Sequence, residues 1–151
     1  MNQSAAAFLP PTRRERIFNK AFGVLVGVGL GPRHYYLLQV RGRKTGRVHS
    51  TPVSVVELDG KRFFVAPRGR TQWVRNAEAA GEVTLKRGRT SQRFLVRPVS
   101  NSEKPVVLSA YLDRFRLAVQ RYFPVSAGSG PEAFAGIVDR YPVLELVPDA
   151  R

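Results

Sequence analysis

The sequence predicts an α+β fold: a small, mainly antiparallel β-barrel, closed or split, with flanking helices. Three strand-like segments follow one another between residues 35 and 67 with only turns between them. This order argues against a doubly wound parallel sheet, which needs a helix after each strand. Closing five or six short strands into a barrel removes the edges that an open sheet would expose. The chain has 151 residues, 43% of them hydrophobic, which predicts one domain over residues 1–151.

The first half of the chain predicts one helix and three strands. A helix is expected over about 13–30, because apolar residues recur there at helical spacing and Pro32 ends the segment. The pair Asp59 and Gly60 is typical of a tight hairpin turn. The strands, rich in aromatic and β-branched residues, are expected at 35–42, 47–58 and 61–67.

The second half adds three helices and three strands. Thr71 is a candidate N-cap for a short helix that Gly81 ends, and Pro105 suits the first turn of a longer one. The helices are expected at 72–80, about 102–123 and about 131–140, and the strands at 82–88, 90–99 and 142–148.

Composition excludes several kinds of active site. The chain has no cysteine, so thiolate chemistry, disulfides and cysteine-based metal sites are ruled out, and a reducing cytoplasm is the expected location. It has two histidines, no Gly-x-Ser-x-Gly elbow, and neither a Walker nor a Rossmann fingerprint. We therefore expect no metal centre and no hydrolytic triad.

The net charge of +14 predicts an anionic partner. Residues 33–97 hold 15 Lys or Arg and 4 Asp or Glu, so 15 − 4 = 11 of these charges lie there. Nucleic acid is the weaker candidate, because Phe63 and Phe64 are adjacent and face opposite sides of their strand. A membrane surface is an alternative, since the segment 13–30 joins a basic start to an apolar run.

The most basic segment is the turn within residues 40–53, VRGRKTGRVHSTPV. Gly42 and Gly46 allow a tight turn, and Arg43, Lys44 and Arg47 can donate charge-assisted hydrogen bonds to a phosphate. Taken alone, this pattern fits a phosphate site and a merely solvated turn equally well.

Residues 37–88 resemble the core of the deazaflavin-dependent nitroreductase family. That family shows a Gly-Arg-Lys-Ser/Thr-Gly turn, a Thr-Pro pair, a Val-Ala pair with a glycine loop, a Trp and an Asn on a short helix, and then a strand. Here these motifs are Gly42 to Gly46, Thr51-Pro52, Val65-Ala66 with Gly69, Trp73 and Asn76, and Val83.

The resemblance implies a split β-barrel related to the flavin-mononucleotide (FMN)-binding oxidoreductases. It implies hydride transfer between reduced coenzyme F-420, an 8-hydroxy-5-deazaflavin, and a small electron-poor acceptor such as a quinone, nitro compound or enone. FMN is the alternative cofactor. A lipid- or fatty-acid-binding member without redox activity is the alternative function. A homodimer is also implied. Peripheral membrane contact stays an alternative to a purely cytoplasmic location, and it rests on the segment 13–30 and the surplus positive charge.

The resemblance also assigns cofactor-binding residues. Arg43 and Lys44, with the backbone of Thr45, Gly46 and Arg47, would hold the cofactor's phosphate and acidic tail. The residues that would border the ring are Ser50, Thr51 and Pro52. Those that would wrap the ring and the ribityl chain are Ala66, Pro67, Arg68, Gly69 and Arg70. The residues that would fix this last loop are Trp73 and Asn76.

Two tyrosines are candidate proton donors. Relatives place tyrosines near the acceptor on the C-terminal helix, and Tyr111 and Tyr122 are the candidates here; the plain alternative is a core or surface tyrosine. This chain departs from the family in its Pro-Arg-Gly-Arg loop and in its Trp-Val-Arg-Asn-Ala helix. The added arginines either strengthen tail binding or crowd the ring.

Overall fold

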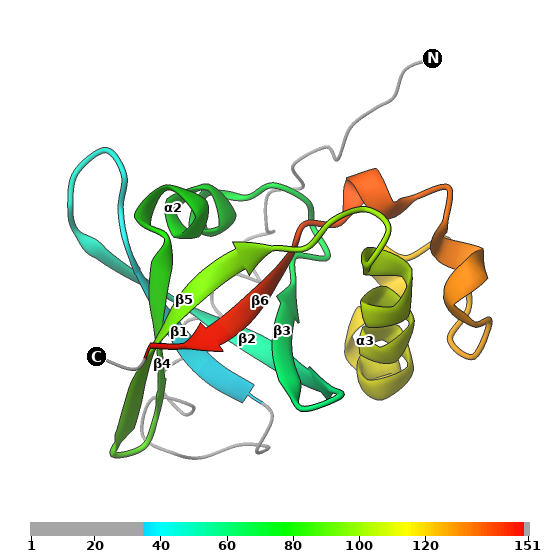
Figure 1. Ribbon diagram of the computed structural model, residues 1–151, viewed down its shortest axis with the longest axis horizontal. Coiled ribbons are helices and arrows are strands. Elements are labelled where there is room, and N and C mark those ends of the chain that lie inside the picture. The colour runs from blue at the N-terminus through cyan, green and yellow to red at the C-terminus, as the bar shows by residue number, and fades with distance from the viewer. Residues whose placement is uncertain (1–34, 150–151) are drawn as a thin grey trace.

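Six strands form a closed antiparallel barrel in the order β1-β2-β3-β6-β5-β4 (Figure 1). The computed structural model describes residues 35–149, so the helix predicted over about 13–30 lies outside the described residues. The strand bounds are β1 Tyr35–Arg41, β2 Val48–Leu58, β3 Lys61–Val65, β4 Glu82–Arg87, β5 Thr90–Pro98 and β6 Val143–Pro148. The predicted fold class is confirmed.

The last strand closes the barrel. β6 pairs with β3, where Leu144 lies opposite Phe64, and with β5, where Leu146 lies opposite Val96. At the other junction β1 pairs with β4 as well as with β2. Each of the six strands therefore has two neighbours, which protects the described sheet from pairing edge to edge with another chain.

Alternate residues of the strands fill the barrel interior. Phe64 is 1% exposed and lies inside, whereas its neighbour Phe63 packs on the outer face beneath a helix. The two aromatics thus face opposite sides, as expected, and both are buried. The interior cluster consists of Leu38, Val40, Val53, Val55, Phe64, Ala77, Val83, Leu85, Phe94, Leu144 and Leu146.

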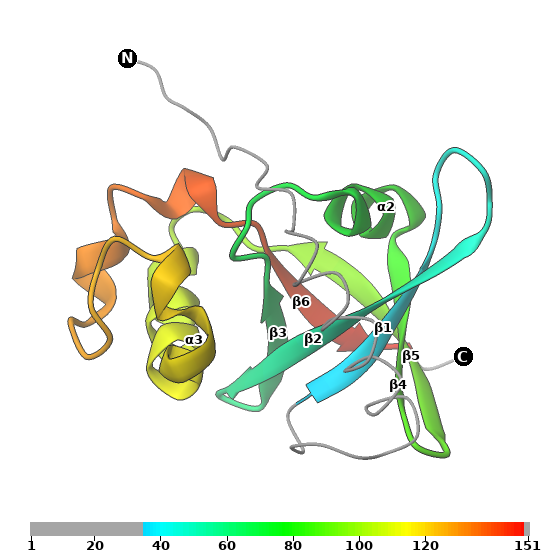
Figure 2. The same ribbon diagram turned by 180° about the vertical axis from the view of Figure 1, so that it is seen from behind.

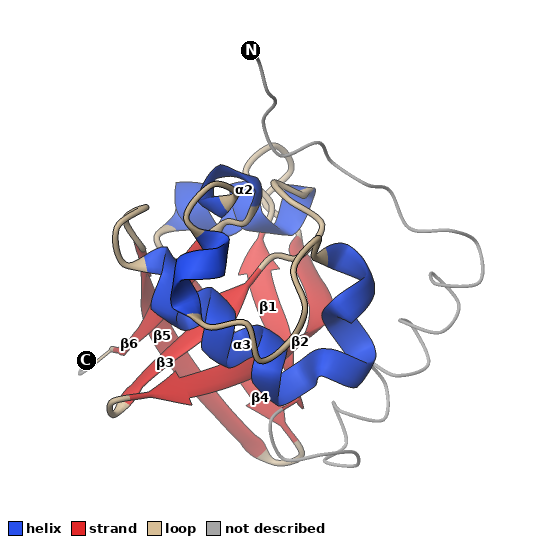
Figure 3. Cartoon of the chain, turned by 90° about the vertical axis from the view of Figure 1, so that its right-hand side faces the viewer, coloured by secondary structure: helices blue, strands red, loops and turns tan. Residues whose placement is uncertain are grey.

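Helix α2 (Gln72–Ala80) covers one end of the barrel (Figures 1 and 3). Ala77 is fully buried in the interior cluster, and the Trp73 ring centroid lies 5.0 Å from that of Phe64. Gly81, with φ of 75°, ends the helix as predicted. Thr71 occupies the N-cap position, but the expected capping hydrogen bond from its side chain is not formed.

Helix α3 (Lys104–Val119) packs against the outer faces of β2, β3 and β6 (Figures 2 and 3). Val56, Phe63 and Val143 contribute to this second cluster from the three strands. Pro105 lies in the first turn of α3, as expected.

The C-terminal helical segments are less continuous than predicted. The segment expected as one helix over about 102–123 forms α3, which has a non-helical backbone at Phe115 (φ −115°, ψ 26°), and then the 3-10 helix η1 (Gln120–Tyr122). The segment expected as a helix over about 131–140 forms two 3-10 helices, η2 (Pro131–Phe134) and η3 (Val138–Arg140). Gly136 lies between them and disfavours a continuous α-helix.

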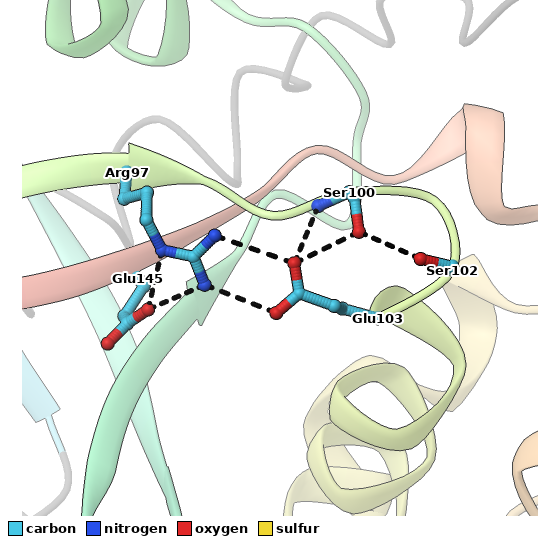
Figure 4. A network of polar contacts seen from close by, with 5 residues as sticks. All are labelled: Arg97, Ser100, Ser102, Glu103 and Glu145. Carbon is cyan, nitrogen blue, oxygen red and sulfur yellow. Dashed lines mark hydrogen bonds and ion pairs between the residues drawn. The ribbon is translucent and has the colours of Figure 1, made fainter.

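An ion-pair network joins the start of α3 to the barrel (Figure 4). Arg97 Nε donates to Glu145 Oε1 at 2.8 Å, and its two terminal nitrogens lie 3.4 and 3.3 Å from the Glu103 carboxylate. Ser100 Oγ donates to the same carboxylate at 2.9 Å. The hydrogen bond from Arg97 lowers the pKa of Glu103, and that from Ser100 adds to the effect.

Candidate functional site

The connection between β1 and β2, residues Gly42–Arg47, forms a hairpin tip that both of its glycines make possible. Gly42 N donates to Arg47 O at 2.7 Å, and Gly46 N donates to Gly42 O at 2.9 Å. Gly46 has φ of 77°, which side-chain-bearing residues rarely adopt. A Cβ at Gly42 would lie 2.9 Å from His49 Nε2. The tip is therefore a shaped turn, with its backbone held at both ends.

Arg41, at the end of β1, and Arg43, within the tip, hold the shape of the tip. Arg41 Nη1 donates to Gly46 O at 3.0 Å. Arg43 donates to Asn76 Oδ1 twice, from its backbone N at 3.1 Å and from Nη1 at 2.7 Å. Asn76 is 6% exposed, so a buried amide of α2 anchors the tip. The family resemblance implied that Asn76 would fix the 66–70 loop. In the structure, Asn76 Oδ1 instead accepts its hydrogen bonds from Arg43 of the tip.

The other two cations of the tip point to solvent. Lys44 and Arg47 are exposed, and within residues 35–149 their charged ends have no hydrogen-bond or ion-pair partner. The backbone N of Arg47 donates to Thr45 Oγ1 at 3.2 Å, which orders the turn between them. Two unpaired cations on a rigid turn can bind an anion without first breaking a contact within the protein.

The three predicted ring-border residues of β2 divide between the two faces of the barrel. Thr51 lies opposite Leu38, which is fully buried in the interior. Directly opposed residues of an antiparallel pair share a face, so Thr51 faces inward. Ser50 and Pro52, on either side of it, lie on the outer face.

The 66–70 loop folds back on itself next to β2. Phe64 of β3 pairs with Val55 of β2, so the loop leaves β3 beside the middle of β2. Ala66 N donates to Pro142 O at 2.9 Å, and Gly69, with φ of 92°, donates from its N to Ala66 O at 3.1 Å. These bonds fix the backbone of the loop.

The two arginines of this loop have different contacts. Arg70 forms an ion pair with Glu78 of α2, which turns its charge toward the helix. Arg68 Nη2 donates to Tyr122 Oη at 3.0 Å, and its guanidinium carbon lies 5.4 Å from the centroid of that ring. Arg68 therefore connects the loop to η1.

A second arginine binds the same phenol. Arg121 Nη2 donates to Tyr122 Oη at 2.7 Å, and its guanidinium carbon lies 4.8 Å from the ring centroid. Tyr141 Oη donates to the backbone O of Tyr122 at 2.6 Å, which fixes the backbone beneath the ring. Sequence reasoning missed Arg121, because only the fold of η1 turns its side chain onto the phenol of its neighbour.

The other candidate tyrosine lies in the core. Tyr111 is 4% exposed and packs with the rings of Phe115 and Phe123, whose centroids lie 5.4 and 6.2 Å away. Burial raises the pKa of Tyr111 far above its ordinary value. A buried, weakened acid is a poor proton donor, so the structure favours the core alternative for Tyr111.

One buried polar atom near the 66–70 loop has no partner. Thr71 Oγ1 is buried, and it forms no hydrogen bond with any described residue. A buried hydroxyl without a partner costs roughly 1–3 kcal/mol, so such an atom beside a loop is a candidate contact for a ligand. The sequence indicates Thr71 only as a helix cap, because nothing in the local pattern shows that its hydroxyl is buried.

The site therefore follows β2 from the tip at its start to the outer-face residues Ser50 and Pro52 and then to the 66–70 loop, with Tyr122 joined to the loop by Arg68. Within residues 35–149 no cluster of three or more His, Asp or Glu could hold a metal ion. No helix in that part of the chain is long and apolar enough to span a membrane.

Solved structures share this fold at low sequence identity. The protein Atu2129 from Agrobacterium tumefaciens, described as of unknown function, has 18% identity and a TM-score of 0.56; 94% of this chain aligns with 60% of that chain, so this chain spans about three fifths of its length. A structure described as a domain-swapped dimer has 23% identity and a TM-score of 0.55, over 89% of this chain and 93% of that one. The F420-H2 dependent reductase FDR-A has 19% identity and a TM-score of 0.51, over 76% of this chain and 94% of that one.

The sequence itself identifies the family. No curated protein matches the chain. The model of a family described as F420H(2)-dependent quinone reductase matches residues 12–122, well over half of the chain. The chain therefore belongs to this oxidoreductase family, whose cofactor is coenzyme F-420, as the resemblance of residues 37–88 implied.

Proposed function

We propose that this protein reduces a small electron-poor acceptor, such as a quinone, nitro compound or enone, at a coenzyme F-420 site that runs along β2. The observation that carries the proposal is the pair of exposed cations, Lys44 and Arg47, on a tip whose shape is held by Arg41 and Arg43. The family assignment supports the reaction class.

The residues present fit this cofactor. Coenzyme F-420 carries a phosphodiester and a glutamate tail, which are anions of the kind that Lys44 and Arg47 can bind. The 66–70 loop has a fixed backbone beside β2, and Thr71 Oγ1 offers a buried hydroxyl in need of a partner. The donor set thus offers cations for the tail and a polar contact near the loop for the ring and ribityl chain.

When bound in its reduced form, the cofactor supplies a hydride. In our proposal the chain's own residues bind the cofactor, orient it against the acceptor and exclude water from the site. Lys44 and Arg47 hold the tail, while Ser50, Pro52 and the 66–70 loop border the ring from the outer face of the barrel. Tyr122 holds a proton close to the acceptor. Orientation of the two reactants is the main contribution expected of the protein.

The proposal also concerns the alternative cofactor, the alternative function and the oligomeric state. FMN has a phosphate that could use the same tip, and it remains the alternative cofactor. The family assignment does not favour the lipid-binding alternative. We also propose a homodimer, supported by the similar fold of a structure described as a domain-swapped dimer.

The direct test is binding followed by turnover. Trp73 is the sole tryptophan of the chain and lies at the start of α2, near the tip and the loop, so its fluorescence can follow titration with the deazaflavin. We expect saturable binding, displacement of FMN by the deazaflavin, and oxidation of the reduced cofactor by a quinone. A folded protein that fails to bind the deazaflavin at micromolar concentrations contradicts the proposal.

A further inference from the structure

We infer that Arg68 and Arg121 are positioning residues that aim the hydroxyl hydrogen of Tyr122 at the acceptor and stabilise the phenolate left after proton transfer. The inference rests on the proposed function, because it names how that same site delivers a proton. It concerns substrates whose reduction leaves negative charge on an oxygen: quinones, nitro compounds and enones.

Two arginines meet at the hydroxyl of Tyr122, a half-buried tyrosine that packs against the cluster beneath α3. Two guanidinium groups, from the 66–70 loop and from η1, donate to this one oxygen at 3.0 and 2.7 Å. Both cations also lie over the ring, with guanidinium carbons 5.4 and 4.8 Å from its centroid. Cations prefer the face of an aromatic ring, so the two arginines fix the plane of the ring as well as its oxygen.

The two bonds leave the hydroxyl hydrogen for a ligand. A phenol oxygen accepts hydrogen bonds through its lone pairs and donates one hydrogen. Arg68 and Arg121 use the accepting capacity, and within the described part of the chain no acceptor receives the hydrogen of Tyr122. An arginine cannot accept it, because a guanidinium carries only donors.

The chemical step is a proton transfer that needs no further oxidant or reductant. Hydride addition leaves a negative charge on the acceptor's oxygen. The Oη–H bond of Tyr122 breaks, an O–H bond forms on the acceptor, and the electron pair of the broken bond stays on Tyr122 as phenolate. Arg68 and Arg121 then face a full negative charge, where charge-assisted hydrogen bonds are strongest. Water returns the proton to Tyr122 after the product leaves.

The position of Arg68 gives the inference a structural reason. Its loop is held by the bond from Ala66 N to the O of Pro142, the residue before β6, at 2.9 Å, and the backbone of Tyr122 is held by Tyr141 Oη at 2.6 Å. Donor and acceptor of the Arg68–Tyr122 bond thus rest on anchored backbone. The arginine in the Pro-Arg-Gly-Arg loop, a departure from the family pattern, acquires a role on the acceptor side of the site.

The first test uses the protein without cofactor. The chain has five tyrosines, and the ring carbon bonded to oxygen, labelled with ¹³C, reports hydrogen bonding to each phenol by NMR. Tyr122→Phe assigns the signal. We expect Arg68→Gln and Arg121→Gln each to shift it toward the value of free tyrosine, Arg68→Lys to shift it less, and Arg114→Gln to leave it unchanged. A Tyr122 chemical shift that is unchanged in both Gln variants overturns the inference.

The second test is a double-mutant cycle, measured by the kinetics of quinone reduction with the reduced deazaflavin. Tyr122→Phe should lower kcat roughly a hundredfold, which is the low end of general acid catalysis. Arg68→Gln should lower kcat about tenfold, as expected for loss of a hydrogen bond to a charged group, and this loss should exceed any change in KM or in the cofactor Kd. It should also enlarge the solvent deuterium isotope effect, because proton transfer becomes slower.

The decisive comparison is the double variant. In the Tyr122→Phe background Arg68→Gln should cost nothing further, because its partner oxygen is gone. An equal tenfold loss in both backgrounds overturns the inference while leaving the proposed function intact. Failure of the unaltered protein to bind the deazaflavin overturns the proposed function itself, and with it the catalytic part of the inference.

Discussion

Arg43 and Asn76 join the β1–β2 tip to helix α2 through two hydrogen bonds to a single oxygen. The backbone N and Nη1 of Arg43 lie 3.1 and 2.7 Å from Asn76 Oδ1. The two residues are 33 positions apart in the chain. The contact makes the tip part of the rigid barrel end, so Lys44 and Arg47 are presented from a fixed turn.

Asn76→Leu should loosen this turn. The substitution removes the acceptor of both hydrogen bonds, and we expect the free energy of unfolding in urea to fall by about 1–3 kcal/mol. Affinity for the deazaflavin should fall as well, because the tip must then be ordered on binding. Arg75→Ala, at an exposed position of the same helix, is the control. Unchanged stability and affinity in Asn76→Leu would show that the tip does not depend on α2.

Gly46→Ala should be destabilising although space is available. Nothing lies within 4 Å of a Cβ placed there, yet φ is 77°. The left-handed backbone costs a residue with a side chain about 1–2 kcal/mol. Thermal and urea unfolding should show a loss of this size, compared with Gly136→Ala, which has the same open space without a positive φ. Equal effects of the two substitutions would argue against the strained turn.

Glu103→Gln should reduce the loss of folding stability that occurs when the pH falls from 7 to 3. The hydrogen bond from Arg97 lowers the pKa of Glu103 in the folded protein. Its carboxylate therefore stabilises the fold above the unfolded pKa of about 4.3, and this contribution is lost as the pH falls through the folded pKa. Urea unfolding midpoints at pH 7 and pH 3 should differ less in Glu103→Gln than in the unaltered chain. Glu57→Gln, at an exposed position of β2, should keep the original difference.

The order of the described elements, the six strands and helix α2 could be predicted from the sequence because they depend on local patterns. Alternating apolar residues, the Asp59-Gly60 turn and the glycine that ends α2 act within a few positions of one another. The break at Phe115 and the three 3-10 helices could not be predicted, since they arise where packing against the barrel overrides helical propensity.

The candidate site was predictable only in part. The cations and glycines of the tip are visible as a motif. The sequence does not reveal that Arg43 holds Asn76, that Thr51 faces the interior, or that two arginines bind one phenol. Each of these depends on strand register or on contacts between residues 33 or 54 positions apart.

The central claim is that Lys44 and Arg47 bind the anionic tail of the cofactor, and the salt dependence of the deazaflavin Kd tests it most directly. The variant Lys44→Gln with Arg47→Gln should raise Kd roughly tenfold at low salt and flatten its rise with ionic strength. The control Lys61→Gln with Arg89→Gln, which removes the same charge at exposed positions, should keep the original slope. A folded tip variant with unchanged Kd and salt slope would contradict the claim.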